Sequence, residues 1–544
     1  MTQAASSSED LGSEAPWQTI PQLIDDAAER YPTIDALVEG DVCLNYVQFR
    51  DHIDEAARAL MAHGLAKGDR VAIWAPNIWE WPIAALAVHR AGAIVVPINT
   101  RFKGREAGYV LQKSKAKMLF TVTDFLDTDY VALLRDAKLE LPDLREIVVF
   151  RGPIPAATIS FDDFLSAARS VSAADLRTRS DSVTGDDLCH IMFTSGTTGL
   201  PKGAMLIHRA VCKGYDAWCE VVGVRPGDRY LIINPYFHSF GFNSGILACP
   251  MRGATNLPHA VFDVSAVMRR VPIDRITFLP GPPAIFQTIL NHPDLDKFDM
   301  STLRLCVTGA AAIPVEMIYQ MRERLGFETI VTGYGLTETS GIVTMCRHDD
   351  DPETIARTSG RAIPDIEVKV FDDDNNEVPR GEPGEIVVRG YVVMKGYLDD
   401  PQQTAETIDP DGWLHTGDIA VMDERGYVQI TDRKKDMYIV GGFNAYPAEI
   451  ENLMLAHPKI GGVAVVGVPD ARMGEVGMAF VIPRPHTTPD PTEIIAWCRE
   501  QMANYKVPRY VEIVDVFPLN PSGKVLKYEL REKGKQILAA QIPK

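Results

Sequence analysis

Apolar residues follow two different spacings between Ile20 and Val122. In some stretches they recur every three or four residues, as on one face of a helix, and in others they form short unbroken runs, as in a buried strand. The helical spacing covers Ile20–Tyr31, Tyr46–Gly64, Trp79–Gly92 and Gly104–Ser114. The short runs are Ala36–Val38, Cys43–Tyr46, Arg70–Trp74, Ala93–Pro97 and Ala116–Val122. This alternation predicts a parallel sheet whose strands are joined by helices.

The same pattern resumes after a looser, polar segment over Pro142–Gly185. Leu188–Phe193 is predicted to be a buried strand and His208–Val222 a helix. More strands follow, each ending in a loop rich in glycine, aromatic or polar residues: Tyr230–Asn234, Ile276–Leu279, Leu303–Thr308 and Thr329–Thr332. Because α/β proteins bind ligands at the carboxyl ends of their strands, these loops are expected to meet in one cleft.

From Gly360 onward the pattern changes to strands with little helix between them. Ile366–Phe371 and Glu385–Arg389 flank an acidic run at 372–377, and Tyr427–Thr431 ends this β-rich part. A turn between strands is the simpler interpretation of the acidic run, and a calcium site is the alternative. The charged run at 432–436 is typical of a solvated turn, and its position between two apolar segments also suits a hinge between domains.

The last hundred or so residues predict a small α+β domain. Its helices are expected over Ala448–Ala456 and Thr492–Met502, with strands over Gly462–Val468, Met478–Ile482 and Tyr510–Val514. The predicted fold class is therefore α/β. A large N-terminal domain contains two α/β sheets and a β-rich part, and a small α+β domain follows. The expected boundaries are 1–16 for a disordered tail, 17–432 for the N-terminal domain and 433–544 for the C-terminal domain.

Composition narrows the class of protein. The chain has 544 residues, of which 46% are hydrophobic and 24% charged, as in an ordinary soluble protein of more than one domain. Its 55 Lys and Arg against 73 Asp and Glu give a net charge of −18, which argues against nucleic acid as a main partner. The eight cysteines are scattered, the first residues do not resemble a signal peptide, and no apolar run is long enough to span a bilayer. We therefore expect a cytoplasmic protein without a membrane span.

Residues 193–203 read Phe-Thr-Ser-Gly-Thr-Thr-Gly-Leu-Pro-Lys-Gly and follow a predicted buried strand. Glycines let backbone N–H groups turn toward an anion, hydroxyls add donors, and a lysine adds a full positive charge. The predicted phosphate-binding residues are Thr194, Ser195, Gly196, Thr197, Thr198, Gly199 and Lys202. The string is not a Walker A loop, because Lys202 is followed by Gly203 instead of serine or threonine. A plain surface turn is the alternative.

Four strings in order resemble the adenylate-forming superfamily of acyl-CoA synthetases, adenylation domains and luciferases. They are the loop at 193–203, Tyr-Gly-Leu-Thr-Glu at 334–338, Trp-Leu-His-Thr-Gly-Asp at 413–418 and Asn-Pro-Ser-Gly-Lys at 520–524. The resemblance extends from about Trp17 to Lys527. It implies that 17–432 is an AMP-binding domain and 433–544 a mobile lid. The implied reaction joins a carboxylic acid to ATP as acyl-AMP, with loss of pyrophosphate, and a thiol then displaces AMP.

The resemblance also assigns roles to individual residues. It places Lys524, Glu338, Thr194, Lys202 and His238 in catalysis, with Glu338 and Thr194 as Mg²⁺ ligands. Lys524 would bridge the carboxylate and the α-phosphate, where charge builds up in the transition state. His238 would lie between the acyl pocket and the thiol tunnel. The simpler alternatives are a helix-cap pair for Glu338 with Thr337, one more exposed lysine in a Lys-rich tail for Lys524, and a core histidine for His238.

Further residues would bind the nucleotide and coenzyme A. Thr337 would contact the α-phosphate, Asp418 the ribose hydroxyls, and Arg433 the ribose or a phosphate. A turn aspartate is the alternative for Asp418. The adenine would lie between the strand end at Gly309, Ala310 and Ala311 and the segment of Gly333, Tyr334 and Gly335. Lys435 occupies the hinge position of the family, and Gly441 and Gly442 would line the pantetheine channel after the lid swings. The implied cofactors are ATP, Mg²⁺ and coenzyme A.

The acyl substrate is predicted from the residues expected to line its pocket. The expected pocket residues are mostly small and uncharged: Tyr236, His238, Phe240, Asn243, Gly281, Thr308, Gly309, Gly333 and Gly335. The absence of a charged residue argues against an amino acid. The strings at 233–238, 279–283, 307–311 and 436–444 resemble the CoA ligases that steroid-degrading actinobacteria use on a propanoate-bearing indanedione, the fragment left from the C and D rings. That acid is the favoured substrate.

Several alternatives stay open at this stage. They are a medium- or long-chain fatty acyl-CoA ligase, an acyl-AMP ligase that loads a carrier protein, a luciferase-like oxygenase and a non-catalytic nucleotide-binding relative. Apart from the small-molecule acid, the partner we hypothesise is a second copy of the chain in a homodimer.

Overall fold

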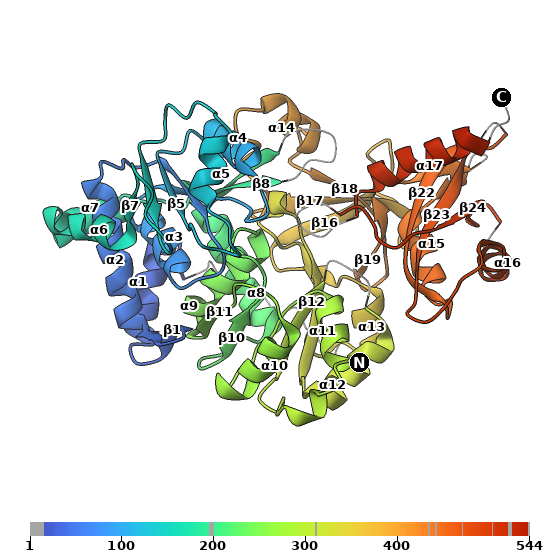
Figure 1. The fold of residues 1–544 in the computed structure, drawn as a ribbon, viewed down its shortest axis with the longest axis horizontal. Coiled ribbons are helices and arrows are strands. Elements are labelled where there is room, and N and C mark those ends of the chain that lie inside the picture. The colour runs from blue at the N-terminus through green and yellow to red at the C-terminus, as the bar shows by residue number, and fades with distance from the viewer. Residues whose placement is uncertain are drawn as a thin grey trace, which may run out of the picture. The chain divides into compact units, whose positions relative to one another are not determined.

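The computed structural model describes residues 16–194, 201–309, 313–433, 436–440, 443–470, 472–502, 504–519 and 525–541 (Figure 1). The chain divides into two compact units. The large unit comprises Met1–Val368 and Val388–Leu414, and the small unit comprises Lys369–Val387 and His415–Lys544. The first is α/β and the second α+β, so the predicted fold class is confirmed.

The large unit contains a mostly parallel sheet that carries the start of the phosphate loop. Its strands are β3 (Arg70–Trp74), β4 (Ile94–Pro97), β5 (Met118–Thr121), β6 (Glu146–Val149), β7 (Ile159–Ser160), β8 (Leu188–Thr194) and β9 (Lys202–Ile207). They lie in the order β7-β6-β5-β3-β4-β8-β9. Neighbouring strands are parallel except β8 and β9, which are antiparallel. The phosphate loop is thus followed by a strand that turns back along β8, before the predicted helix begins at His208.

A second sheet brings the other predicted loops to one edge. Its strands are β1 (Asp35–Glu39), β2 (Val42–Asn45), β10 (Arg229–Ile232), β11 (Thr255–Pro258), β12 (Leu305–Gly309), β13 (Thr329–Tyr334), β14 (Thr344–Met345) and β15 (Arg361–Ala362). The strand orders are β10-β11-β1-β2 and β12-β13-β14-β15, and parallel bridges from Phe278 to Tyr230 and to Leu305 join the two halves. Because β10, Phe278, β12 and β13 run parallel, their carboxyl ends share one edge of the sheet, as predicted.

One expected strand of this sheet is reduced to a bridge. Ile276–Leu279 was predicted as a strand, and only Phe278 forms a β-bridge. The reason is the sequence that follows. Pro280 has no N–H to continue the hydrogen-bond ladder, and Pro283 begins helix α11 (Pro283–Leu290).

The segment Pro142–Gly185 is more regular than its polar sequence suggested. It contains β6 and β7 and the helices α6 (Phe161–Ser166) and α7 (Ala173–Asp181). Each helix has a serine cap, since the Ser160 hydroxyl accepts from Asp163 N at 3.0 Å and the Ser172 hydroxyl accepts from Asp175 N at 3.1 Å. These Ser-x-x-Asp pairs are helix-start signals that a reading of apolar spacing alone misses.

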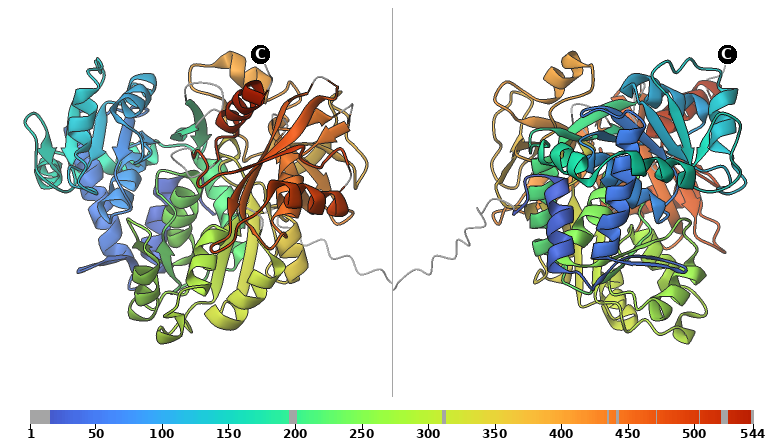
Figure 2. Two further views of the ribbon diagram at one scale, coloured as in Figure 1. Left: turned by 45° about the vertical axis from the view of Figure 1, so that its right-hand side comes forward. Right: turned by 90° about the vertical axis from the view of Figure 1, so that its left-hand side faces the viewer.

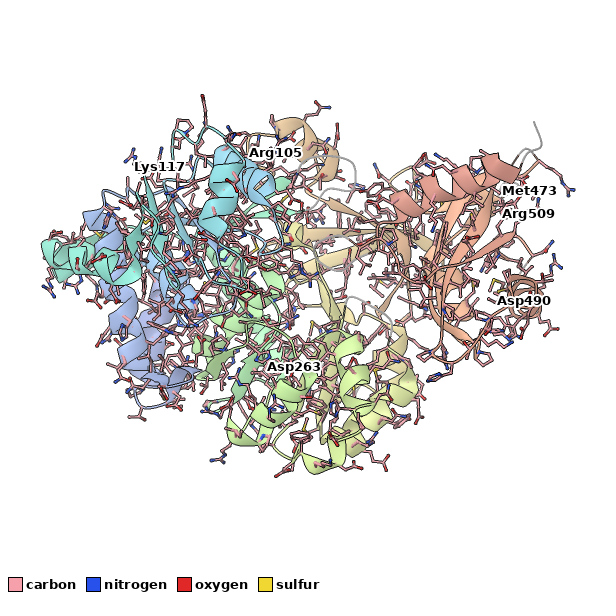
Figure 3. All side chains as sticks on the ribbon, in the orientation of Figure 1. Arg105, Lys117, Asp263, Met473, Asp490 and Arg509 are labelled. Carbon is pink, nitrogen blue, oxygen red and sulfur yellow. The ribbon has the colours of Figure 1, made fainter. Side chains whose placement is uncertain are left out.

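Helices surround both sheets of the large unit (Figure 1). Besides α6, α7 and α11 they are α1 (Ile20–Arg30), α2 (Tyr46–Ala62), α3 (Glu80–Arg90), α4 (Gly104–Ser114), α5 (Tyr130–Asp136), α8 (His208–Val222), α9 (Ala248–Arg252), α10 (Val264–Ile273), α12 (Val315–Leu325), α13 (Pro352–Arg357) and α14 (Pro401–Thr407). Asp263, labelled in Figure 3, caps α10 by accepting from Ala266 N at 2.7 Å. All eleven residues of α3 are buried, which makes it a core helix.

The β-rich part forms a sheet of β16 (Ile366–Phe371), β17 (Pro383–Gly390), β18 (Leu414–Met422) and β19 (Val428–Arg433), in that order. The division between the units falls within β16, β17 and β18. The acidic run after β16 is a turn, because Asp372 Oδ1 accepts from both Asp374 N and Asn376 N at 2.9 Å. This is the simpler of its two interpretations.

The small unit also contains a second sheet, orange in Figure 2. Its strands are β20 (Tyr438–Val440), β21 (Phe443–Ala445), β22 (Ile460–Asp470), β23 (Gly474–Pro483) and β24 (Tyr510–Ile513), accompanied by helices α15 (Pro447–Met454), α16 (Pro491–Gln501) and α17 (Lys527–Gln541). The order is β21-β20-β23-β22, with β24 parallel to β23. Helix α17 was not predicted, because its apolar residues are few among charged ones. Leu530 of α17 nevertheless lies in the core of this unit, with β22 and β23.

All eight cysteines lie within the described residues, and all but Cys43 are buried, as expected of small core residues. Among the described helices none combines the length and the apolar character that crossing a bilayer requires.

Candidate active site

The phosphate loop begins and ends on paired strands. Thr194, the last residue of β8, pairs with Lys202, the first residue of β9. The Thr194 hydroxyl donates to the Lys202 carbonyl oxygen at 3.4 Å. The two strands thus fix both ends of the loop. Its predicted binding residues Ser195, Gly196, Thr197, Thr198 and Gly199 lie outside the described residues.

The Lys202 ammonium group has two partners in the large unit. Its Nζ donates to Gln403 Oε1 on α14, and it lies 5.2 Å from the centre of the Tyr397 ring. A cation over an aromatic face is held by the negative potential of the ring. Neither contact is with a carboxylate, and no ion pair of Lys202 is found within the described part of the chain, so the charge is available for an anion.

Tyr397 also contacts Glu338. The Tyr397 hydroxyl donates to Glu338 Oε1 at 2.8 Å. Glu338 lies in the short 3₁₀ helix η4 (Thr337–Thr339), where the Thr339 hydroxyl accepts from Leu336 N at 3.0 Å. The Glu338 carboxylate therefore points to another segment and does not pair with Thr337 as a helix cap. Burial first, and then the neighbouring carboxylate, raise the pKa of Tyr397, so its hydroxyl keeps the proton that it donates.

The segment around Tyr397 adds an antiparallel neighbour to β9. Met205 N donates to Gly396 O at 3.0 Å, and Leu398 N donates to Gly203 O at 2.8 Å. Met394 N donates to Glu338 O at 2.8 Å. One segment, residues 394–398, is thus hydrogen-bonded to the strand that carries Lys202 and to the backbone of Glu338.

Sequence reasoning missed Tyr397 and Gln403. Gln403 lies 201 residues from Lys202 along the chain, and Tyr397 lies 59 residues from Glu338. The available signal was Gly396-Tyr397 one residue after the apolar run at 391–394, followed by the helix-start pair Asp400-Pro401. That signal indicates a turn and a helix but does not reveal which strand the segment joins.

Close backbone approach explains the glycines at the ends of β12 and β13. Gly309 pairs with Gly333, which also pairs with Met345. A Cβ on Gly333 would lie 2.1 Å from Met345 Sδ, and one on Gly335 would lie 2.3 Å from Gly341 O. The predicted adenine-binding residues Gly309, Gly333, Tyr334 and Gly335 therefore lie at one tightly packed strand end. Ala310 and Ala311 lie outside the described residues.

The His238 loop follows β10 on the same edge. His238 is exposed, and its Nδ1 accepts from Phe240 N at 3.3 Å, so it is not a core histidine. A π-helical turn, η2 (Gly241–Leu247), comes directly after this loop. Such turns interrupt ordinary helices often at functional sites. Tyr236, by contrast, is fully buried and donates to Asn256 Oδ1 at 2.6 Å, so its ring belongs to the core behind the loop.

Among the expected acyl-pocket residues, Thr308 differs in the environment of its hydroxyl group. Its side chain is buried, and its hydroxyl has no hydrogen-bond partner among the described residues. A buried hydroxyl without a partner costs free energy unless a ligand or a water satisfies it. Asn243 of η2, another expected pocket residue, is also buried and donates to Ser340 O at 3.0 Å, which ties η2 to the turn after Glu338.

Phe242 of η2 packs on buried histidines. Its ring centre lies 4.2 Å from that of His190, which is 4.9 Å from His89, and His89 is 5.5 Å from His208. Burial lowers the pKa of His190 and of His208 to about 3 and also lowers that of His89. At neutral pH these imidazoles are therefore uncharged and serve as packing groups.

In the small unit, Asp418 and Arg433 occupy facing positions on β18 and β19. Asp418 is 5% exposed, and its backbone N donates to the Thr416 hydroxyl at 3.1 Å. Gly417 has φ of 72°, which bends the strand just before it. Asp418 therefore lies within a strand and is not a turn aspartate. Lys435, Gly441, Gly442 and Lys524 lie outside the described residues.

The residues present suit a hard cation bound with a triphosphate. Glu338 offers a carboxylate and Thr194 a hydroxyl, both oxygen ligands of the kind Mg²⁺ prefers. No group of three or more His, Cys, Asp or Glu side chains that could hold a metal occurs among the described residues. Mg²⁺ commonly uses one or two carboxylates together with substrate phosphates, so the donor set fits a cation that arrives with ATP.

Comparison with known proteins gives the family. The AMP-binding enzyme family matches residues 24–398, and the AMP-binding enzyme C-terminal domain matches residues 449–524. Two relatives share the name 3-[(3aS,4S,7aS)-7a-methyl-1,5-dioxo-octahydro-1H-inden-4-yl]propanoyl:CoA ligase. The one from Rhodococcus jostii (strain RHA1) is 48% identical over 95% of this chain and 99% of its own. The one from Mycobacterium tuberculosis (strain ATCC 25618 / H37Rv) is 46% identical over the same shares.

A solved structure agrees with this relationship. The anthranilate CoA ligase AuaEII in complex with anthranoyl-AMP has a TM-score of 0.84 and 28% identity, covering 96% of this chain and 98% of that one. The resemblance seen in the four sequence strings is confirmed by the two family matches. The chain belongs to the AMP-binding enzyme family.

Proposed function

We propose that this enzyme is an ATP-dependent acid–CoA ligase whose acid is the bicyclic propanoate named in its two relatives, an indanedione carrying a methyl group and a propanoate chain. The observation that carries the proposal is near-complete coverage at 48% identity by a ligase of that name. The arrangement of Lys202, Tyr397 and Glu338 supports the same reaction, because a positive charge and a carboxylate both contact one tyrosine.

The proposed reaction has two balanced steps. A carboxylate oxygen of the acid attacks the α-phosphorus of ATP, the bond to the β,γ-phosphates breaks, and acyl-AMP and pyrophosphate form. The thiol of coenzyme A, losing its proton, then attacks the acyl carbon and AMP leaves with its electron pair. The first step needs positioning and charge neutralisation more than covalent help from the protein.

In the large unit, Lys202 would bind the β- and γ-phosphates and Thr194 would donate to them at the entrance of the loop. Glu338 and Thr194 would hold Mg²⁺, which supplies neutralisation of the phosphate charge when bound. Thr337 would contact the α-phosphate, and the strand ends at Gly309, Gly333, Tyr334 and Gly335 would accept the adenine. His238, exposed at its loop, would separate the acid from the thiol.

Other assigned residues belong to the small unit or lie outside the described residues. Asp418 and Arg433 would bind the ribose, Lys524 would stabilise the charge at the α-phosphate, and Lys435 would act at a hinge. Gly441 and Gly442 would line the pantetheine path. We also propose a mobile C-terminal domain that begins at residue 433, a homodimer and a cytoplasmic location.

The preference for a bicyclic keto-acid has support in the pocket residues. Thr308 presents a buried hydroxyl without a partner among the described residues, and a ketone oxygen can accept a hydrogen bond from it. A simple fatty acid has no such acceptor beyond its carboxylate.

Product analysis tests the reaction. The enzyme is incubated with ATP, Mg²⁺, coenzyme A and the bicyclic propanoate, and AMP, pyrophosphate and thioester are quantified together. We expect one AMP and one pyrophosphate for each thioester. Pyrophosphate released without any CoA thioester would instead indicate an acyl-AMP ligase that loads a carrier protein, and ADP as product would contradict the proposal.

A further inference from the structure

Tyr397 touches both of the charged groups that the proposed reaction needs. Its hydroxyl donates to Glu338 Oε1 at 2.8 Å, and its ring lies 5.2 Å from Lys202 Nζ. The side chain is 8% exposed, so these contacts are made away from bulk water, where electrostatic interactions are stronger.

The backbone around Tyr397 is held on several sides. Residues 394–398 pair with β9, and Met394 N donates to Glu338 O. Tyr397 N donates to the Thr404 hydroxyl at 2.9 Å. Gly396 has φ of 135°, and a Cβ there would lie 2.7 Å from Thr404 Cγ2, so α14 packs closely against the segment. The position of the Tyr397 ring is therefore fixed by its own backbone and not by its two charged neighbours alone.

We propose that Tyr397 is a positioning residue that holds the Glu338 carboxylate and the Lys202 ammonium group in the arrangement that receives MgATP. The inference rests on the proposed function. The hydroxyl occupies one oxygen of Glu338 and so fixes the direction of the carboxylate toward a cation. The ring lies beside Lys202 and limits the positions of a long, flexible side chain.

Gln403 completes this arrangement on the lysine side. Its Oε1 accepts from Lys202 Nζ, and its Nε2 donates to Glu406 on the same helix. An amide oxygen is a neutral acceptor, which a triphosphate can displace at little cost because the phosphate bond is charge-assisted. During that exchange the Tyr397 ring stays in contact with Lys202, while the hydrogen-bond partner of the lysine changes from Gln403 to a phosphate.

The chain contains a matched control for Tyr397. Tyr391 also lies beside a lysine, with Lys213 Nζ 4.8 Å from its ring centre, and its hydroxyl also donates to an oxygen, the Pro364 carbonyl at 3.2 Å. Lys213 pairs with Asp365 at 2.7 Å. Tyr391 touches neither Lys202 nor Glu338 in the described hydrogen bonds and ring contacts, so its variants report the general effect of losing such a tyrosine.

Binding of ATP without acid or coenzyme A is the direct test. Wild-type enzyme and the variants Tyr397→Phe, Tyr397→Leu, Tyr391→Phe and Tyr391→Leu are titrated by calorimetry with ATP at a series of Mg²⁺ concentrations. Tyr397→Phe removes only the hydroxyl. We expect it to raise the Mg²⁺ concentration for half-maximal binding about 10- to 100-fold, the usual cost of losing a group that orients a metal ligand.

Tyr397→Leu removes the ring as well. It should weaken ATP binding at saturating Mg²⁺ by a further two- to fivefold or so, as expected for a lost cation–π contact. Both Tyr391 variants should match wild type in both measurements. The proposal would be overturned if the Tyr397→Phe enzyme needed no more Mg²⁺ for half-maximal ATP binding than the Tyr391→Phe enzyme. It would also be overturned if Tyr397→Phe weakened ATP binding by the same factor at every Mg²⁺ concentration.

A double-mutant cycle provides the second measurement. If the hydroxyl acts through Glu338, adding Tyr397→Phe to Glu338→Ala should change the Mg²⁺ requirement by less than twofold, whereas independent effects would multiply. Multiplying effects would overturn the proposal. Because acid and coenzyme A are absent, an error about the acyl substrate does not affect the result. A wild-type enzyme that binds no MgATP would overturn the proposed function and this inference with it.

Discussion

Thr194 and Lys202 face each other across the β8–β9 hairpin, with the Thr194 hydroxyl 3.4 Å from the Lys202 carbonyl oxygen. The first threonine of the phosphate loop and the only lysine of that loop are therefore directly opposite each other on two paired strands. The pairing of these two strands therefore holds the two ends of the loop next to each other. The lysine charge is also placed where the loop ends, beside Tyr397.

Replacing Lys202 tests this arrangement. Lys202→Met keeps most of the apolar stem and removes the charge. We expect kcat/KM for ATP to fall roughly 10²- to 10³-fold, as for the loss of one preorganised charge partner. Pyrophosphate release with varied ATP measures the effect. Lys213→Met, which removes the lysine beside Tyr391, is the control and should change kcat/KM for ATP less than threefold or so, as is usual for a residue away from the site.

The close approach of Gly335 to Gly341 predicts a cost for any side chain. A Cβ at residue 335 would lie 2.3 Å from Gly341 O and 2.4 Å from Gly341 C, both backbone atoms that cannot rotate away. Gly335→Ala should lower the free energy of unfolding by about 1–3 kcal/mol, as overpacking usually does. It should also weaken ATP binding.

Gly214→Ala is the matched control for that change. Gly214 lies in α8, and a Cβ there would meet the side chains of Ile342 and Val392 at an ordinary 3.6 Å. Alanine is favoured over glycine inside a helix by roughly 0.5–1 kcal/mol. The Tm of Gly214→Ala should equal or exceed that of wild type, and a Tm as low as that of Gly335→Ala would refute the packing explanation.

The buried histidines predict how stability depends on pH. Burial gives His190 and His208 pKa values of about 3, whereas an unfolded histidine has a pKa near 6.5. Between these values the unfolded chain binds protons that the folded protein does not, so stability falls as the pH is lowered from about 6.5 toward 3. Each histidine contributes a slope of about 1.4 kcal/mol per pH unit.

His190→Gln removes one of these protonation sites. In denaturant unfolding between about pH 4 and pH 6, the stability of the variant should change with pH by about 1.4 kcal/mol per pH unit less than that of wild type, and above about pH 7 the two slopes should agree. The groups around His190 are the imidazoles of His89 and His208, the amide of Asn243 and the ring of Phe242. Replacing the exposed His348 by Gln should leave the slope unchanged. An equal loss of slope in both variants would exclude the buried site as its origin.

Lys524 is predicted from the sequence to act in only one half-reaction. Lys524→Ala should slow acyl-AMP formation by at least about 10²-fold, because a charge partner of the α-phosphate is lost. Thioester formation from supplied acyl-AMP and coenzyme A should stay near the wild-type rate. Single-turnover assays of each half-reaction measure the two rates. Equal damage to both would contradict a lid that exchanges Lys524 for a thiol channel.

Local sequence determined much of the fold. The helix over Gly104–Ser114 and the strand over Arg70–Trp74 were predicted with the bounds they have, because the apolar spacing of the one and the short apolar run of the other are unambiguous there. The regular secondary structure of Pro142–Gly185 was underestimated, because its helices are short and begin at serine caps. Ile276–Leu279 was overestimated, since Pro280 limits its pairing.

Only some of the site residues could be predicted from the sequence, and the reason is a different one. Glu338 and Lys202 stand in recognisable strings, and their chemical types follow from the needs of a triphosphate. Their partner Tyr397 is defined by the pairing of residues 394–398 with β9, a contact between distant parts of the chain. Such pairing depends on the whole fold, and no spacing of residues near Tyr397 indicates it. The exposure of His238 likewise follows from the loop after β10 and not from its aromatic neighbours.

The most direct test of the account is a competition between two acids for the same enzyme. The bicyclic indanedione propanoate and octanoate are supplied at equal concentrations with limiting enzyme, ATP, Mg²⁺ and coenzyme A, and the two thioesters are separated by mass. We predict that the bicyclic thioester exceeds octanoyl-CoA by at least about tenfold, which corresponds to roughly 1.4 kcal/mol of discrimination. An excess of octanoyl-CoA would contradict the proposed substrate and favour a medium-chain fatty acyl ligase.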